Sequence, residues 1–327
     1  MNRVAPRGRK NLDVGMMTTE GSRLDGRSLA LLLALATLWS LSFIFIKVAA
    51  AEIPAVTLAL ARVALAALVL LMVALAGGMR FPAEPAFFVR YAIMGITNNA
   101  VPFALIVYAT SRLGAGPASI LNATAPIFAL VVAHFTTADE KITPAKLGGI
   151  LLGVAGVAAM TGPHAVAGLS ADFHAVAAML TACFFYGLSA VYGRRFSGID
   201  PAVSAACQLS AAALVLTPAA LILDRPWTLA TPSAEVLFAV CALAVASTAL
   251  AYVIYYALIA RAGSTNTILV KLLIPVGGVA LGVVLLGEAF SSGEATGTLL
   301  IALALIVIDG RALRRFRAVG GGVRPAP

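Results

Sequence analysis

Three cationic side chains, Lys47, Arg62 and Lys271, lie within apolar stretches long enough to cross a lipid bilayer. A charge inside the hydrocarbon is costly, so each is a candidate functional residue. A cavity lined by such groups favours a carboxylate or phosphate ligand. None of the fourteen acidic residues falls near the middle of an apolar stretch. The pattern therefore indicates a small zwitterionic or anionic ligand rather than a cationic one.

Each cation also has a structural explanation. Lys47 is near one end of its stretch and can extend to the bilayer surface. Arg62 lies eight residues after Pro54, and it can reach the surface or pair with a helix end. For Lys271 we keep both interpretations open, a structural role and a place in a binding site.

Two prolines strengthen the case for Lys271. Pro126 and Pro275 lack an N–H and leave unpaired the carbonyl four residues earlier, which belongs to Asn122 and Lys271 respectively. An unpaired carbonyl in a bilayer needs another partner or a wet cavity. We therefore expect both prolines to kink their helices and both polar residues to line one cavity. The alternative is a pair of kinks that serve only helix packing.

Other polar and aromatic residues share helical spacing or interrupt apolar stretches. Aromatic rings with a polar tip can hold the side chain and the polar ends of an amino acid, although packing or an interfacial belt is the alternative. The candidate substrate-binding residues of this kind are Trp39, Ser42, Asn98, Asn99, Tyr186, Ser189, Thr248, Tyr252 and either Tyr255 or Tyr256, of which Tyr256 is preferred.

These residues must be positioned by membrane helices. The chain has 327 residues, 61% apolar and 11% charged, whereas soluble domains carry about 25% charged residues. A bilayer-spanning helix needs about 20 apolar residues. The sequence predicts an all-α polytopic membrane protein with ten transmembrane helices, at 28–50, 54–76, 86–111, 116–135, 143–161, 171–193, 201–223, 233–260, 264–286 and 292–310.

Charge predicts the orientation. Lys and Arg concentrate in the tails and in alternate loops, which places both termini in the cytoplasm. Ten helices satisfy this arrangement because their number is even. The expected location is the inner (plasma) membrane, with a disordered basic tail over 1–27 and a second basic tail over 311–327. The first apolar stretch is too long for a signal-peptide core, so we expect it to remain as a membrane helix.

The sequence also repeats itself. Trp39-Ser40-Leu41-Ser42 aligns with Tyr186-Gly187-Leu188-Ser189, and Pro54-Ala55-Val56 aligns with Pro201-Ala202-Val203. Residues 28–161 and 171–310 are therefore interpreted as two copies of a five-helix unit. Because five is odd, the second copy is inverted in the membrane, as in many transporters.

These motifs resemble the EamA family of the drug/metabolite transporter superfamily. The opening pattern is Leu38 to Phe43 followed by Lys47, Pro54 and Arg62. The second signature is a proline-containing helix, a Gly-Glu turn and a glycine-containing helix. It is represented by Leu273-Ile274-Pro275, Gly287-Glu288 and Gly297, and in the first copy by Ala125-Pro126, Glu140 and Gly149, with Asp139 departing from the usual glycine.

The resemblance implies export or exchange of amino acids and related metabolites by alternating access, and the family includes aromatic amino-acid exporters of the YddG type. Enzyme motifs, metal-ligand spacing and nucleic-acid-binding patterns are absent from the sequence. We expect no cofactor, and a small solute and the lipid bilayer as partners. One chain can enclose the path, so a monomer suffices.

The leading hypothesis is a secondary transporter of amino acids. The alternatives are a carrier of phosphorylated or nucleotide-linked metabolites and a multidrug exporter. From other classes we retain a membrane-embedded enzyme acting on lipid and a non-transporting scaffold.

Overall fold

A computed structural model describes residues 26–82, 84–138, 141–168, 172–196, 199–262, 267–286 and 292–309. Within these ranges the chain forms helices and turns and no β-strand. Apolar segments adopt helices in a bilayer because a helix pairs its own backbone N–H and C=O groups. The all-α prediction is confirmed. The predicted basic tails lie outside the described residues except for Gly26 and Arg27, as do Asp139, Glu140, Gly287 and Glu288.

The first half of the chain contains seven α-helices and one π-helical segment among its described residues. They are α1 (Gly26–Ala49), α2 (Ala55–Ala76), α3 (Pro85–Gly95), η1 (Ile96–Ala100), α4 (Val101–Leu113), α5 (Ala115–Asn122), α6 (Ala125–Thr136) and α7 (Pro144–Gly168).

In the second half, hydrogen-bonded caps mark three helix starts. Asp172, Asp200 and Ser233 accept hydrogen bonds from backbone N–H groups in the first turns of α8, α9 and α10. The described elements are α8 (Phe173–Tyr192), η2 (Gly193–Phe196), α9 (Pro201–Leu223), η3 (Pro226–Thr228), α10 (Ala234–Ala244), η4 (Val245–Leu250), α11 (Ala251–Ala262), α13 (Val270–Leu286) and α14 (Ser292–Asp309).

Seven helical spans within the described residues are long and apolar enough to cross a membrane. The other three predicted segments fall on α7, α13 and α14, and α7 and α14 carry shorter apolar stretches over Pro144–Ala159 and Ala295–Ile308. The count of ten therefore stays a prediction. The seven spans are Gly26–Ala49, Ala55–Ala76, Pro85–Leu113, Ala118–Thr136, Phe173–Tyr192, Pro201–Leu223 and Ala234–Arg261.

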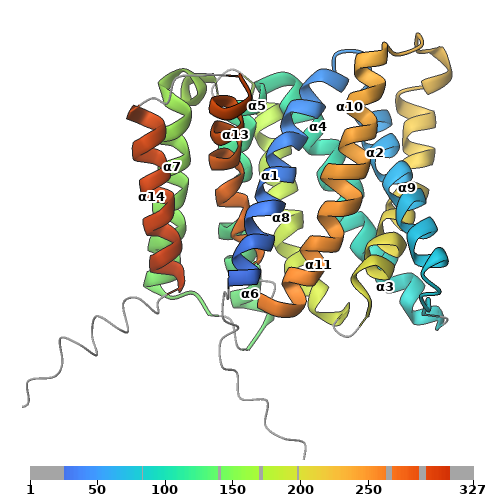
Figure 1. Cartoon of the computed structure of the whole chain (residues 1–327), viewed down its shortest axis with the longest axis horizontal. Coiled ribbons are helices and arrows are strands. Elements are labelled where there is room, and N and C mark those ends of the chain that lie inside the picture. The colour runs from blue at the N-terminus through green and yellow to red at the C-terminus, as the bar shows by residue number, and fades with distance from the viewer. Residues whose placement is uncertain are drawn as a thin grey trace, which may run out of the picture.

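The two halves pack in a reciprocal manner. Helix α7 lies beside α14 at one edge of the bundle (Figure 1), and α2 packs against α9. In addition, α1 packs against α13, and its counterpart α8 packs against α6. The first turn of α1 and the last turn of α14 lie at the same end of the bundle.

Close helix contact explains one of the glycines. A Cβ atom on Gly187 of α8 would lie 2.8 Å from the backbone carbon and 2.9 Å from the carbonyl oxygen of Phe128 in α6. Small residues permit such backbone approach between membrane helices. Glycine at this position therefore sets the spacing between α8 and α6.

Two π-helical segments interrupt corresponding helices. The segment η1 joins α3 to α4, and η4 joins α10 to α11. Pro102, in the first turn of α4, supplies no N–H to the helix ladder. In η4, the Thr248 hydroxyl donates to the Leu243 carbonyl oxygen at 2.7 Å. Such segments are rare and frequently occur at functional sites.

Two carboxylates connect the halves at the end of the bundle opposite the first turn of α1. Glu52 Oε2 accepts a hydrogen bond from the Ser233 N–H at 2.7 Å, directly before α10. Asp224 Oδ2, directly after α9, accepts hydrogen bonds from the N–H and hydroxyl of Thr57 in α2. We call these two interactions the cross-half caps.

Candidate functional site

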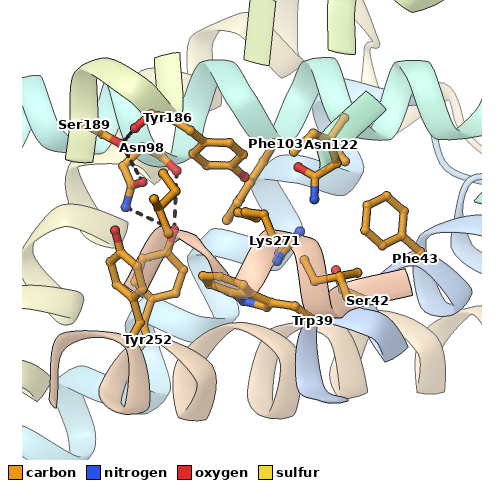
Figure 2. A pocket seen from close by; sticks show the side chains of 15 residues that line it. Trp39, Ser42, Phe43, Asn98, Phe103, Asn122, Tyr186, Ser189, Tyr252 and Lys271 are labelled. Atoms are coloured by element: carbon orange, nitrogen blue, oxygen red, sulfur yellow. Dashed lines mark hydrogen bonds between the residues drawn. The ribbon is translucent and has the colours of Figure 1, made fainter. Parts of the chain in front are cut away.

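A cavity lies where helices of both halves meet (Figure 2). Helices α1, α2, α4, α5, α8, α11 and α13 and the segment η1 supply its walls. The residues that line it are Trp39, Ser42, Phe43, Arg62, Asn98, Phe103, Ile106, Asn122, Tyr186, Ser189, Tyr252, Tyr255, Ile268, Lys271 and Ile274.

Most of the residues predicted from the sequence line this cavity. Helical i, i+3 spacing brings Trp39 and Ser42 to one face of α1, and Tyr186 and Ser189 to one face of α8. The structure thus brings together Trp39, Ser42, Asn98, Asn122, Tyr186, Ser189, Tyr252 and Lys271.

Three predicted residues lie behind the wall instead. Asn99 donates a hydrogen bond from Nδ2 to the Tyr252 hydroxyl at 2.7 Å, and the Thr248 hydroxyl oxygen accepts a hydrogen bond from Arg62 Nε. Tyr256 is buried, and its hydroxyl has no hydrogen-bond partner within the described part of the chain. Tyr255 lines the cavity in its place. The prediction assumed α-helical spacing from Thr248 to Tyr256. In η4 the backbone pairs residues five apart, so residues after it face a different direction from the one that α-helical spacing gives.

Lys271 occupies the centre of the cavity. Its side chain is 7% exposed, and its Nζ lies 4.2 Å from the Trp39 ring centroid and 4.1 Å from that of Tyr186. Figure 2 shows the side chain extending between these two rings. Both distances fall within the range of cation–π attraction. The lysine is thus a buried cation held between aromatic faces contributed by α1 and α8.

Arg62, for which the sequence left a structural and a functional role open, also lines the cavity. It is 3% exposed, so it does not extend to the bilayer surface as one of our interpretations had it. Its Nε donates to Thr248 Oγ1 at 2.7 Å, and its guanidinium carbon lies 3.8 Å from the Phe103 ring centroid. The position of Arg62 deep in its apolar stretch indicates a functional role. Its partner Thr248, however, lies far away in the sequence and is not predicted from it.

A hydrogen-bond network forms one wall of the cavity. Ser189 donates its hydroxyl to Asn98 Oδ1 at 3.0 Å. The amide nitrogen of Asn98 lies 3.3 Å from the Tyr252 hydroxyl and 3.4 Å from Gln208 Oε1. Side chains from η1, α8, α9 and α11 are therefore fixed relative to one another.

The first proline breaks its helix. Helix α5 ends at Asn122, a turn follows, and α6 starts with Pro126 in its first turn. The thiol of Cys183 lies 3.5 Å from the Leu121 carbonyl oxygen and 3.9 Å from that of Asn122, so it acts as their weak donor. The side-chain Oδ1 of Asn122 is buried without a partner among the described residues.

The second proline lies within α13. The Ile274 carbonyl directly before it accepts a hydrogen bond from the Ser40 hydroxyl of α1 at 2.5 Å. The two halves therefore differ at their prolines, with a break in the first half and a proline inside a helix in the second.

The cavity carries charge of one sign. Arg62 and Lys271 are both positive, and none of the described residues that line the cavity is Asp or Glu. No group of potential metal ligands occurs among the residues that the structure describes. Two cations in the same cavity as Asn122 Oδ1, an acceptor with no partner in the part of the chain that the structure describes, can bind a carboxylate together with a hydrogen-bond donor.

The sequence profile of the EamA-like transporter family matches residues 26–162 and matches again over 174–309. The chain belongs to this family. Being an EamA-like transporter with several membrane-length apolar helices, it is a multi-pass membrane protein that acts on a small molecule.

Individual proteins show the same relationship. The EamA-like transporter is 27% identical over 317 residues to a probable amino-acid metabolite efflux pump of Salmonella typhimurium, with 92% of this chain and all of the relative covered. It is 22% identical over 281 residues to the uncharacterized transporter YoaV of Bacillus subtilis, with 84% and 94% covered. A solved crystal structure superposes with a TM-score of 0.67 at 19% identity over 86% of this chain and 97% of the other, which shows a shared fold.

Proposed function

We propose that this EamA-like transporter exports or exchanges small metabolites that carry a carboxylate, with amino acids as the leading class. The observation that carries the proposal is the pair of buried cations, Arg62 and Lys271, in a cavity whose described lining contains no acid. The relative named as an amino-acid metabolite efflux pump supports the same substrate class.

The roles of the lining residues follow from their chemistry. Lys271 and Arg62 bind the carboxylate through charge-assisted hydrogen bonds. Asn122 Oδ1 accepts a hydrogen bond from the substrate ammonium. The rings of Trp39, Tyr186, Tyr252 and Tyr255 and the polar groups of Ser42, Ser189 and Asn98 enclose the remainder of the substrate.

Transport proceeds by alternating access between two inverted repeats of five membrane helices, 28–161 and 171–310. The reciprocal packing of α1 on α13 and α8 on α6 supports this arrangement, as does the double family match. The protein works in the inner membrane with both termini in the cytoplasm, and one chain is sufficient. It acts as a carrier and not as an enzyme.

The test is uptake of a labelled amino-acid panel into proteoliposomes, with and without a pH gradient. We expect saturable flux of one amino-acid group that unlabelled members inhibit. We also expect the flux to be insensitive to pH, because no membrane-embedded acid is available to exchange a proton.

Two lysine variants sharpen this test. Lys271→Ala removes one of the two cations of the cavity and should abolish flux, whereas Lys47→Ala removes an exposed lysine and should leave flux unchanged. Normal flux in Lys271→Ala would remove this residue from the mechanism. Absence of flux for all amino acids would shift the search to phosphorylated or nucleotide-linked metabolites, whose phosphates suit the same two cations.

A further inference from the structure

Carboxylate binding does not explain why the ammonium group of Lys271 lies between two aromatic rings. Its ammonium group is directed between the rings of Trp39 and Tyr186, with centroids 4.2 and 4.1 Å away (Figure 2). Two aromatic faces on opposing helices that converge on one cation form a binding slot for a positive charge. The two rings would form this slot whether or not the Lys271 ammonium group occupied it.

The lysine has no anionic partner among the residues that the structure describes. No hydrogen bond or ion pair from its Nζ is found among the described residues, and no acid is among those that line the cavity. An ammonium group can donate three hydrogen bonds, and a buried charge normally requires compensation. The two rings are therefore the compensating groups that the protein provides.

More aromatic side chains continue the slot. The Tyr255 ring centroid lies 5.7 Å from that of Trp39, and the Tyr252 centroid lies 5.8 Å from that of Tyr255. Four rings from α1, α8 and α11 thus line the same cavity. Aromatic cages of this composition recognise organic ammonium groups, quaternary ones included.

We infer that Trp39, Tyr186, Tyr252 and Tyr255 form a cage for an organic ammonium group and that Lys271 acts as a tethered occupant that excludes such cations. Lys271 is thereby a specificity-determining residue. It provides positive charge for an anion and denies the cage to amines that lack a carboxylate. Repulsion from Arg62, the second cation of the cavity, acts in the same direction.

Removal of Lys271 distinguishes an occupied cage from simple carboxylate binding. Removal of Lys271 should create affinity for a simple organic cation, rather than only weaken affinity for an anion. Lys271→Ala empties the cage of its occupant, while Lys271→Arg retains a long cationic side chain. The two substitutions should therefore have opposite consequences for cation binding.

The protein contains a reporter for this experiment. Its two tryptophans are Trp39, in the cage, and Trp227, whose side chain is 68% exposed on η3. A Trp227→Phe background makes Trp39 the sole indole. Tetramethylammonium chloride is titrated into the purified full-length protein, with sodium chloride at equal ionic strength as the reference, and the Trp39 emission is recorded.

We expect saturable tetramethylammonium binding in Lys271→Ala at least tenfold tighter than in the Lys271 and Lys271→Arg forms. Adding Tyr186→Leu to Lys271→Ala should weaken that binding by at least tenfold. Lys271→Ser serves as a second opened form if the alanine variant does not fold, as judged by circular dichroism and gel filtration.

Two results would overturn the inference. One is the lack of any saturable response in a folded Lys271→Ala or Lys271→Ser protein. The other is equal affinity in the lysine and alanine forms. Because the titration measures binding in detergent, it does not depend on flux. Failure of the amino-acid uptake experiment and failure of the cage are therefore distinguishable.

Discussion

The carboxylate of Asp224 accepts two hydrogen bonds from Thr57, one from its backbone N–H at 2.7 Å and one from its hydroxyl at 2.9 Å. Asp224 follows α9, whereas Thr57 lies in the first turn of α2. A helix of the first half is thus capped by an acid of the second half. The first-turn N–H groups and the helix dipole favour a negative charge at this place.

Loss of this cap should destabilise the protein. Asp224→Ala leaves the Thr57 N–H without its carboxylate partner, which costs about 1–2 kcal/mol for a typical cap. We expect a lower melting temperature in detergent, with a smaller decrease for Thr57→Val, because the backbone bond survives there. An unchanged melting temperature in Asp224→Ala would show that the cap adds nothing to stability.

The other cross-half cap should depend on pH. The hydrogen bond from the backbone of Ser233, followed by that from its side chain, lowers the pKa of Glu52 from its ordinary value. A lowered folded-state pKa means that the cap stabilises the protein above the ordinary carboxyl pKa of about 4.3. That stability is lost as the pH falls through the folded-state pKa.

Comparison with Glu52→Gln isolates this effect from other titrating groups. At neutral pH the wild-type protein should melt at a higher temperature than Glu52→Gln. As the pH is lowered below about 4, the two melting temperatures should converge. A difference that is constant across the pH range would contradict the assignment of the carboxylate as the cap.

Transport should be sensitive even to the conservative substitution Arg62→Lys. Arg62→Lys retains the charge but loses the Nε bond to Thr248 and the planar contact with Phe103. A hydrogen bond to a charged group is worth about 1.5–3 kcal/mol, so we expect transport to fall roughly 10- to 100-fold. Initial rates in proteoliposomes provide the measurement.

A double-mutant cycle tests whether this loss arises at Thr248. Thr248→Val should reduce transport by a similar factor, and Arg62→Lys with Thr248→Val should be no worse than the more severe single variant. Full additivity of the two losses would mean that the residues act independently.

The contact between α8 and α6 provides a packing prediction. Gly187→Ala places a methyl group against the Phe128 backbone and should destabilise the protein by about 1–3 kcal/mol. Gly148→Ala in α7 is the matched control, because a Cβ atom there meets nothing within 4 Å. The melting temperature should fall for the first variant and stay constant or rise for the second. Equal behaviour of the two variants would contradict the close approach.

The sequence predicts helical segments well in this protein because bilayer solvation leaves few alternatives to a helix. The spans predicted over 86–111 and 233–260 correspond to the single apolar spans Pro85–Leu113 and Ala234–Arg261 of the structure. The π-helical turns inside them were not anticipated. They depend on local competition for backbone carbonyls, such as that of Leu243 with the Thr248 hydroxyl, and this leaves no apolar periodicity in the sequence.

The candidate site was partly predictable for a related reason. Trp39 and Tyr186 were identified because they occupy equivalent places in the sequence repeat, and Lys271 because a charge in an apolar stretch is unusual. Arg62 satisfied the same criterion but has a partner, Thr248, on a distant helix. Contacts between segments so far apart require the tertiary structure, and the choice of Tyr255 over Tyr256 required the phase of η4.

The two π-helical segments each contain one residue more than a regular α-helical path requires. An α-helix turns about 100° per residue, so regularising η4 would swivel α11 relative to α10 by roughly that angle. Tyr252 and Tyr255 would leave the cavity wall, and the same rearrangement of η1 would withdraw Phe103. The extra residue in each half therefore allows the following helix to rotate. Such a rotation would exchange the residues that line the cavity without unfolding any helix.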